Sequence, residues 1–238
     1  MSFQIFLPIR AYRVSRFPAV LLLALVVIAS AACSRGDAAN TARIAARADT
    51  LSDSALMTSA DLGRYEGNEK APIWIVMISD FQCPYCKEWH DSTLTAVRRE
   101  YVATGKARLA YLHLPLQGHK HAMVMAKASL CASSQKKFWE YTDAMFHKQK
   151  TVSNLLDVGP LLISLADSIK LDTAAFSHCT RSNVVASLVQ SDMRQADQAK
   201  ITATPSFFVG PFILQGAVPI KTFRMAVDSA LVLAAKPR

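Results

Sequence analysis

The stretch that decides the fold is Cys83-Pro84-Tyr85-Cys86, which follows the apolar run 74–78 after four further residues. A short apolar run of this kind is typical of a buried strand, and the residues after the motif recur at helical spacing. The two cysteines therefore stand at the start of a helix. There the partial positive charge and free N–H groups of the first turn stabilise a thiolate, so we expect the pKa of Cys83 to lie below the ~8.5 of an ordinary cysteine. A second sulfur three residues later suits the pair to thiol–disulfide exchange.

Two other uses of this cysteine pair stay open at this point. Cys83, Cys86 and His90 offer three ligands for zinc or iron, although a structural zinc site usually has a second close ligand pair, and the sequence has none. A purely structural disulfide is the other alternative, but a two-residue loop at a helix start is an unusual place for an inert one. We predict no metal site and no organic cofactor, because the two sulfurs themselves store the electrons.

Residues 1–32 have the layout of a secretory signal peptide. Three arginines precede an apolar stretch over 19–28, and small residues then lead to Cys33. The apolar run is shorter than the about 20 residues of a transmembrane helix. We therefore predict export with cleavage, and an uncleaved anchor is the alternative.

Cys33 is a candidate lipid attachment site. A cysteine directly after small residues resembles the lipobox of bacterial lipoproteins, in which the cysteine becomes the acylated first residue. Ser30 stands where that pattern usually has Leu, so ordinary cleavage after Ala31 or Ala32 is the alternative. In either case we expect the protein in the cell envelope, in the periplasm or on the outer face of a bacterial membrane, with a lipid anchor if Cys33 is acylated.

The composition is that of a moderately basic globular domain. The 27 Lys and Arg residues exceed the 18 Asp and Glu residues by nine, and removing Arg10, Arg13 and Arg16 with the signal segment leaves a net charge of +6. No basic tract is interleaved with aromatic residues, which argues against a nucleic-acid partner. The 238 residues, 51% of them hydrophobic, suit one domain with a substantial core.

Residues 33–60 are predicted to form a flexible tether. The segment 34–59 is rich in Ala, Ser, Thr, Asp and Arg and has no aromatic residue, which suits a tether or a loosely held helix better than a core element. We expect the folded domain to cover 61–238.

The chain from the motif onward predicts helix, strand, a long helical block, a hairpin and a last helix. The helix after the motif carries apolar residues at roughly helical spacing: Trp89, Leu94, Val97 and Tyr101. The remaining predicted elements are a strand over 107–114, a helical block over about 118–200 with no convincing strand, a hairpin over 206–215 and a helix over 220–233.

This order is an α/β arrangement, the thioredoxin fold with a large all-helical insertion between its two halves, and the sequence resembles the DsbA-like thiol:disulfide oxidoreductases. The likeness runs from about 61 to 233, and the residues that carry it are 78–86 (ISDFQCPYC), 137–141 (KFWEY), 202–209 (TATPSFFV) and 216–217 (GA). A CxxC motif alone is a weak signal. Combined with Thr-Pro about 120 residues later and before a hairpin, it is specific.

The resemblance assigns roles to the four residues of the motif. Cys83 is expected to be the attacking sulfur, pointing outward at the helix start, and Cys86 the shielded sulfur that resolves or re-forms the disulfide. Pro84 and Tyr85 are expected to tune the redox potential, because stabilising the Cys83 thiolate makes the pair more oxidising.

Thr204 and Pro205 are expected to form the second part of the site and to bind substrate. In the resembling family this proline is cis and faces the CxxC motif, and the backbone of the preceding residue pairs with an extended substrate. Proline is the one residue for which a cis peptide costs little. A plain turn proline at the start of a strand is the alternative.

Cys131 and Cys179 are the remaining cysteines of the domain, and both fall in the helical block. Related proteins often carry a disulfide in this region, and an oxidising compartment favours one. We therefore expect a structural disulfide between them. Two buried free thiols or a second redox-active pair are the alternatives.

Asp80 and the histidines are less informative. Asp80, three residues before Cys83, is either a buried carboxylate that helps proton transfer or a cap of the following turn. The six histidines follow no metal-ligand spacing, and we expect most of them to be solvent-exposed.

The sequence thus predicts an exported dithiol oxidase that forms disulfides in partly folded envelope proteins with free thiols and is recycled by a membrane redox partner. A reductase or isomerase with the same site is the alternative, since Tyr85 and Thr204 occur in isomerase-like relatives too. The tether is too short and too polar for the separate dimerisation domain of those isomerases. A redox-inert chaperone that holds extended polypeptide beside Cys83 is the alternative of another class.

Overall fold

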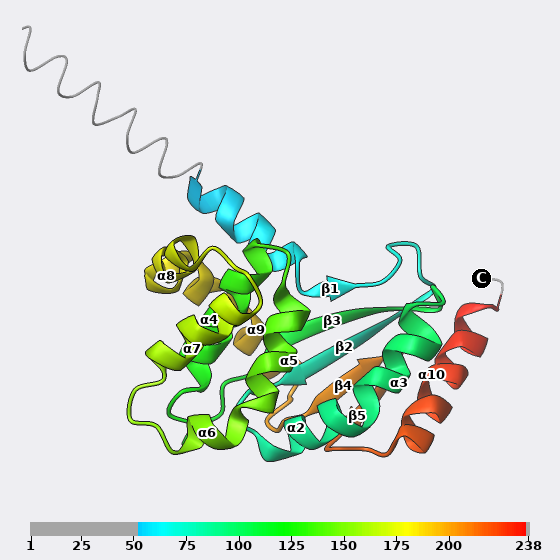
Figure 1. Ribbon diagram of the computed structural model, residues 1–238. Helices are drawn as coiled ribbons and strands as arrows, with labels where there is room; N and C mark the ends of the chain where they lie inside the picture. Colours follow the sequence, from blue (N-terminus) through cyan, green and yellow to red (C-terminus); the bar gives the residue numbers. More distant parts are fainter. Residues whose placement is uncertain (1–51, 237–238) are drawn as a thin grey trace, which may run out of the picture. The chain divides into compact units, whose positions relative to one another are not determined.

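The computed structural model describes residues 52–236 (Figure 1). The predicted signal segment 1–32, Cys33 and the part of the predicted tether up to residue 51 lie outside the described residues. Across 52–236, no helix combines the length and the apolar character needed to cross a membrane.

A five-stranded mixed sheet forms the centre of the fold, in the order β1-β3-β2-β4-β5. The strands are β1 (Tyr65–Glu66), β2 (Ile73–Ser79), β3 (Ala107–His113), β4 (Ser206–Val209) and β5 (Phe212–Gln215). β2 and β3 run parallel, and the other neighbouring strands are antiparallel. The central strand β2 is apolar because both of its faces are covered, and its carboxyl end leads into the CxxC motif.

The helical stretch after the motif contains two π-helical turns. It consists of α2 (Pro84–Trp89), η1 (His90–Leu94), α3 (Thr95–Val97) and η2 (Arg98–Val102). Each π turn holds an extra residue, and the five-residue step from Trp89 to Leu94 spans the first of them. The wider turn keeps both side chains on the buried face, where they are 0% and 1% exposed.

The core lies on both faces of the sheet. On one face Trp89 packs against Phe207 of β4 and Phe223 of α10 (Ile220–Ala234), with ring centroids 4.5 and 5.3 Å apart. On the other face, Ile78 of β2 packs with Ala196 and Ile201 at the end of the insertion. Successive residues of a strand point to opposite faces, which is why Ile78 belongs to a separate cluster from its neighbour Met77.

The helical insertion lies between β3 and β4 in the chain, and Figure 1 shows its helices grouped together beside the sheet. Its elements are α4 (Ala122–Ser134), α5 (Phe138–His147), α6 (Gln149–Ser153), α7 (Gly159–Ser168), α8 (Thr173–Arg181) and α9 (Asn183–Gln198). The thioredoxin fold with a large helical insertion, predicted from the sequence, is confirmed. The short helices α6 and α8 were not separately predicted.

The last part of the predicted tether is helical over residues 52–62, which is the helix alternative that the sequence left open, and its end packs on the domain. Ala60 is fully buried, and its carbonyl accepts a hydrogen bond from the Ser133 hydroxyl of α4. A Cβ on Gly63 would meet the Ser133 backbone oxygen at 2.5 Å. Ala60 and Gly63 are small enough to allow this close packing. The sequence did not indicate it, because the segment has no aromatic residue to mark a buried face.

Candidate active site

The turn from β2 to α2, residues 80–83, positions the two cysteines. The Cys83 N–H donates to the Asp80 carbonyl at 3.1 Å, and the Cys83 carbonyl accepts the first hydrogen bond of α2 from Lys87 N–H at 3.2 Å. Cys83 is therefore the residue that caps the helix, and Pro84 follows at its first position. Proline suits this position because its missing N–H would have no partner there.

The loop before β4 brings Thr204 and Pro205 against the motif. Their peptide bond is cis, and the Cys83 thiol donates a hydrogen bond to the Thr204 carbonyl at 3.3 Å. Two segments 121 residues apart in the chain thus form one site.

Both sulfurs are covered, which corrects the expectation that Cys83 points outward. Cys83 is 3% exposed and Cys86 2%, because the Thr204–Pro205 loop lies over the first sulfur. Both cysteines are free. Of the motif, Pro84 and Tyr85 are exposed, Tyr85 by 61%.

The two cysteines have opposite pKa shifts. A hydrogen bond from the Cys86 thiol, with smaller contributions from the Thr204 side chain and the Cys86 and Tyr85 N–H groups, lowers the pKa of Cys83 from 9.0 to about 6 against the effect of burial. Burial, and then the neighbouring Cys83, raise the pKa of Cys86 well above 9.0. Near neutral pH the first sulfur is a thiolate and the second holds its proton.

Asp80 caps the turn that precedes the motif. Its buried carboxylate accepts hydrogen bonds from Gln82 N–H at 2.7 Å and Leu116 N–H at 2.9 Å, and it contacts His119 Nδ1 at 2.6 Å. Its backbone N–H faces the Cys86 sulfur at 3.5 Å. The sequence left two roles open for Asp80, proton transfer and capping of the turn. The structure shows the capping contacts, and these tie the turn to the loop after β3.

Sequence reasoning missed two residues that reach this turn from the helical part of the chain. His119 contacts Asp80, and Gln149, 6% exposed, donates hydrogen bonds to the carbonyls of Phe81 and Cys83. Neither residue belongs to a motif, and both stand more than 30 positions from the cysteines.

Two of the six histidines depart from the expectation that most are solvent-exposed. His113 and His121 are buried, 1% and 7% exposed. The His113 ring contacts the Ser129 hydroxyl at 2.7 Å, and burial lowers its pKa well below 6.5, so the ring is neutral. The His121 ring contacts the Leu155 carbonyl at 2.9 Å. Each histidine has a polar partner that spacing along the chain did not reveal.

His90 is not directed at the cysteines. Its ring nitrogens contact Asp91 at 3.0 Å and Asp143 at 2.8 Å. Within residues 52–236, no group of three or more His, Cys, Asp or Glu side chains is arranged to hold a metal ion.

Cys131 and Cys179 are joined by a disulfide, with Cα atoms 5.7 Å apart. The bond ties α4 to α8, and both residues are buried inside the helical insertion. This geometry excludes the alternative of two free thiols in this structure.

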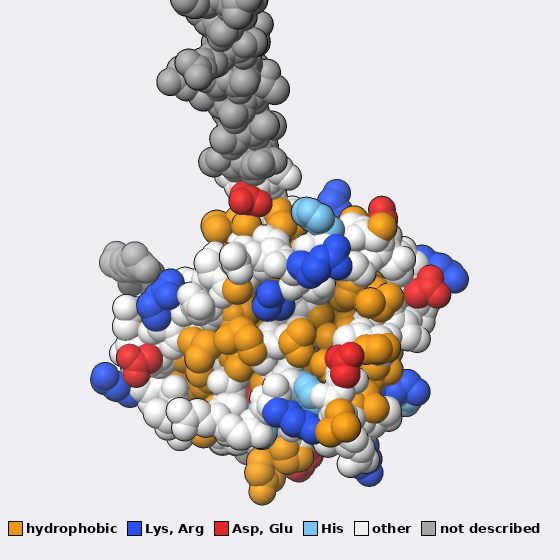
Figure 2. Space-filling model, turned by 90° about the vertical axis from the view of Figure 1, so that its left-hand side faces the viewer, with side chains coloured by type: hydrophobic (Ala, Val, Ile, Leu, Met, Phe, Trp, Pro, Cys, Tyr) orange, Lys and Arg blue, Asp and Glu red, His pale blue; other side chains and the backbone are white. Residues whose placement is uncertain are grey.

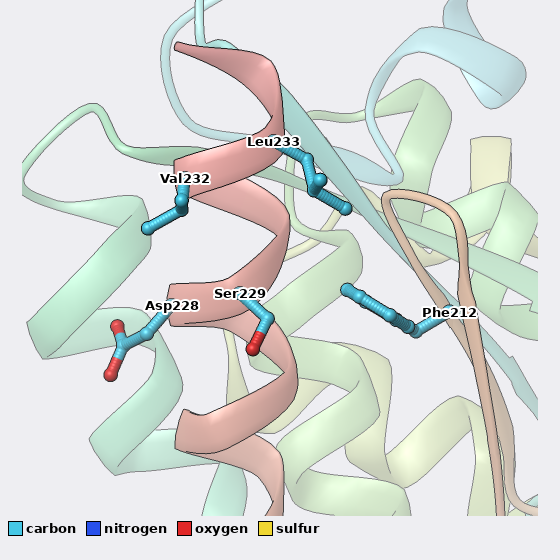
Figure 3. Close-up of a pocket in the computed structure, with 5 residues that line it drawn as sticks. All are labelled: Phe212, Asp228, Ser229, Val232 and Leu233. Atoms are coloured by element: carbon cyan, nitrogen blue, oxygen red, sulfur yellow. The ribbon is translucent and has the colours of Figure 1, made fainter. Parts of the chain in front are cut away.

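Exposed apolar side chains occur on several elements of residues 52–236. Figure 2 shows hydrophobic side chains gathered on one face of the molecule. Within the insertion, Met123, Leu156 and Ile163 are 37%, 96% and 43% exposed. Figure 3 shows a pocket of about 430 Å³ at α10 and β5, lined by Phe212, Asp228, Ser229, Val232 and Leu233. None of these five residues belongs to the CxxC motif or the Thr204–Pro205 loop, so the chemistry is not assigned to that pocket.

The sequence matches the family described as Thioredoxin over residues 59–229. The chain belongs to the thioredoxin family. Solved structures of DsbA-like proteins share this fold. Wolbachia pipientis alpha-DsbA1 is 24% identical with a TM-score of 0.65, covering 72% of this chain and 92% of that one. Oxidised BdbD from Bacillus subtilis is 21% identical with a TM-score of 0.65, covering 71% and 92%.

Relatives of two kinds match the sequence. Na(+)/H(+) antiporter NhaA 3 of Salinispora tropica is 30% identical over 176 residues, which cover 73% of this chain and 26% of the antiporter. Probable disulfide bond formation protein D of Bacillus anthracis is 26% identical over 146 residues, which cover 60% of this chain and 67% of that protein. The matched part thus spans about a quarter of the antiporter and two thirds of the disulfide bond formation protein.

Proposed function

We propose that this protein is an exported thiol:disulfide oxidoreductase that acts as a dithiol oxidase, forming disulfides in envelope proteins through Cys83 and Cys86. The observation that carries the proposal is the Cys83 sulfur at the start of α2, 3.3 Å from the carbonyl of Thr204 and beside the cis Thr204–Pro205 bond, and the opposite pKa shifts of the two thiols, Cys83 lowered to about 6 and Cys86 raised, agree with it. A stabilised Cys83 thiolate favours the reduced form of the pair, and this makes the disulfide form a stronger oxidant.

The exchange starts from a Cys83–Cys86 disulfide. A substrate thiolate attacks the Cys83 sulfur, the bond between the two cysteines breaks, and Cys86 leaves with the electron pair and takes up a proton. A second substrate thiolate then attacks the substrate sulfur bound to Cys83. Cys83 leaves as a thiolate, so two electrons pass to the protein and a disulfide remains in the substrate. The sulfurs carry these electrons without a bound cofactor.

Substrate is expected to bind beside the exposed Tyr85 and the Thr204–Pro205 loop. The Thr204 carbonyl accepts a hydrogen bond from the protonated Cys83 thiol at 3.3 Å. It is positioned to contact an extended chain once Cys83 is bonded to substrate. The substrates are partly folded proteins with free thiols. A membrane redox partner is expected to take the two electrons from the reduced pair.

Two features support a location in the cell envelope. The signal-like segment 1–32 predicts export, and the Cys131–Cys179 disulfide is typical of an oxidising compartment. Cys33 is proposed as the site of lipid attachment. Labelling of cells with a radioactive fatty acid tests this, because a Cys33→Ala variant loses the label only if the cysteine is acylated.

The activity is tested by refolding a reduced protein substrate with wild type, Cys83→Ser and Cys86→Ser. The proposal expects disulfide formation by wild type, none by Cys83→Ser, and accumulation of mixed disulfides on Cys86→Ser. Binding of unfolded substrate without any exchange by wild type would instead indicate a redox-inert chaperone.

The direction of exchange is tested by equilibrating the protein in graded glutathione mixtures. An oxidase is expected to have a midpoint more oxidising than the glutathione couple of the cytosol. A strongly reducing midpoint contradicts the oxidase and indicates a reductase.

A further inference from the structure

The carbonyl groups of the turn at residues 80–83 meet a side chain of the helical insertion. Gln149 is the first residue of α6 and is 6% exposed. Its Nε2 donates to the Phe81 carbonyl at 2.8 Å and to the Cys83 carbonyl at 2.9 Å. Both protons of one buried amide group are therefore used on the backbone that carries the first redox sulfur.

These two hydrogen bonds are not redundant. Within residues 52–236 the Phe81 carbonyl has no other hydrogen bond, and a buried carbonyl without a partner costs about 1–3 kcal/mol. The Cys83 carbonyl also accepts from Lys87 N–H at 3.2 Å, so Gln149 occupies its second lone pair. The amide thus fixes the orientation of the Cys83 carbonyl at the point where α2 begins.

The neighbouring residues of the insertion hold Gln149 in place. Just before it, the Phe146 ring packs on the Phe81 ring with centroids 5.2 Å apart, and Asp143 contacts the His90 ring at 2.8 Å. The end of α5 and the start of α6 therefore touch the segment around the motif at three points. Such packing restricts the freedom of Gln149 and makes its hydrogen bonds directional.

We propose that Gln149 is a positioning residue for the thiol–disulfide exchange, holding the Cys83 carbonyl so that the first N–H groups of α2 face the Cys83 sulfur. The backbone rotation that orients this carbonyl also sets where Tyr85 and Cys86 stand relative to the sulfur. The insertion therefore tunes the reactive cysteine through one amide. This inference rests on the proposed exchange activity.

Two substitutions test the role of Gln149. Gln149→Leu keeps a side chain of similar size and removes both donors. Gln149→Glu keeps the shape, but its ionised carboxylate accepts hydrogen bonds only, and it donates one when protonated. Gln135→Leu is the matched control: this glutamine also lies in the insertion and bonds a backbone, through the Asp172 N–H and carbonyl.

The readouts are the Cys83 pKa, followed by the ultraviolet absorbance of its thiolate, and the redox midpoint in glutathione. In Gln149→Leu we expect the Cys83 pKa to rise by about one unit, so that the thiolate fraction at pH 6 falls from about one half to about one tenth. The midpoint should become less oxidising. In Gln149→Glu the ionised carboxylate should raise the Cys83 pKa at least as much as Gln149→Leu does. The difference from wild type should diminish at pH values where the carboxyl group is protonated.

The outcomes separate the inference from the proposed function. A folded Gln149→Leu protein whose Cys83 pKa and midpoint equal those of wild type, or an equal change in Gln135→Leu, overturns the positioning role. If Gln149→Leu does not fold, Gln149→Glu decides by the same criterion. A wild-type protein without exchange activity overturns the proposed function, while the pKa comparison still decides whether Gln149 controls Cys83.

Discussion

The two cysteine pairs of this protein show how surroundings and spacing determine what a pair of sulfurs does. Cys83 and Cys86 are three residues apart at a helix start, are unbonded, and have opposite pKa shifts. Cys131 and Cys179 are 48 residues apart, are bonded, and join two helices inside the insertion. In a two-residue loop a disulfide removes little chain entropy, whereas in a long loop it removes much. The difference favours exchange at the first pair and stability at the second.

The largest expected effect is on catalysis. Cys83→Ser should reduce the rate of disulfide exchange at least about 1,000-fold, because the nucleophile is absent. The double variant Cys131→Ser/Cys179→Ser should keep most of the rate at a temperature where it is folded. Refolding of a reduced substrate measures both. If Cys131→Ser/Cys179→Ser loses exchange activity while it remains folded, the two cysteine pairs act together. That result would contradict the division into one pair for exchange and one for stability.

The next largest effect is on stability. Removing the Cys131–Cys179 bond should lower the free energy of unfolding by about 4 kcal/mol, less any strain, because it closes a loop of 48 residues. Opening the Cys83–Cys86 disulfide should lower the free energy of unfolding much less, because its loop is short. Denaturant titrations of the double serine variant and of Cys83→Ser/Cys86→Ser make the comparison. Similar losses in the two would show that loop length does not govern their stability.

The pH dependence of the reduced protein provides a sharper test of the first pair. The pKa of Cys83 is lowered from 9.0 to about 6, so the unfolded chain binds one more proton between these values. Stability from this thiolate is fully present above pH 9 and is lost as the pH falls through about 6, with a slope of at most about 1.4 kcal/mol per pH unit. Cys86, whose pKa is raised, does not titrate in this window. Denaturant titrations should show this slope in wild type, with Cys83–Cys86 reduced and Cys131–Cys179 intact, and not in Cys83→Ser.

The smallest expected effect concerns the loop over the motif. Thr204→Val keeps the branched shape and removes the hydroxyl that helps lower the pKa of Cys83. We expect that pKa to rise by about half a unit, because the Thr204 side chain makes a small contribution to stabilising the thiolate. Thr202→Val, an exposed position in the same loop, is the control. Equal alkylation rates for wild type and Thr204→Val across pH would contradict a role for the hydroxyl.

The sequence pattern predicted those parts of the fold that depend on residues close together in the chain. The apolar run of β2, the helix after the motif and the β4–β5 hairpin all have strong periodicity or turn signals. The two-residue strand β1 was not predicted, since two residues carry no periodic pattern and pair only because β3 lies beside them. The packing of residues 52–62 was missed for a related reason: Ala60 is buried and Gly63 lies against Ser133 because both are small, and small residues leave no apolar pattern in the sequence.

The sequence by itself determined the redox motif, its place between a strand and a helix, and the likeness that linked Cys83 to Thr204 and Pro205. The motif and its place follow from short spacings, where covalent geometry leaves few choices, whereas the link to Thr204 and Pro205 came from the family resemblance. Only the tertiary structure decided that Gln149 and His119 reach the turn before the motif, and that the Thr204–Pro205 loop covers the Cys83 sulfur. Such contacts depend on how separately formed elements pack, and a hydrogen bond between residues 66 positions apart leaves no periodic trace in the chain.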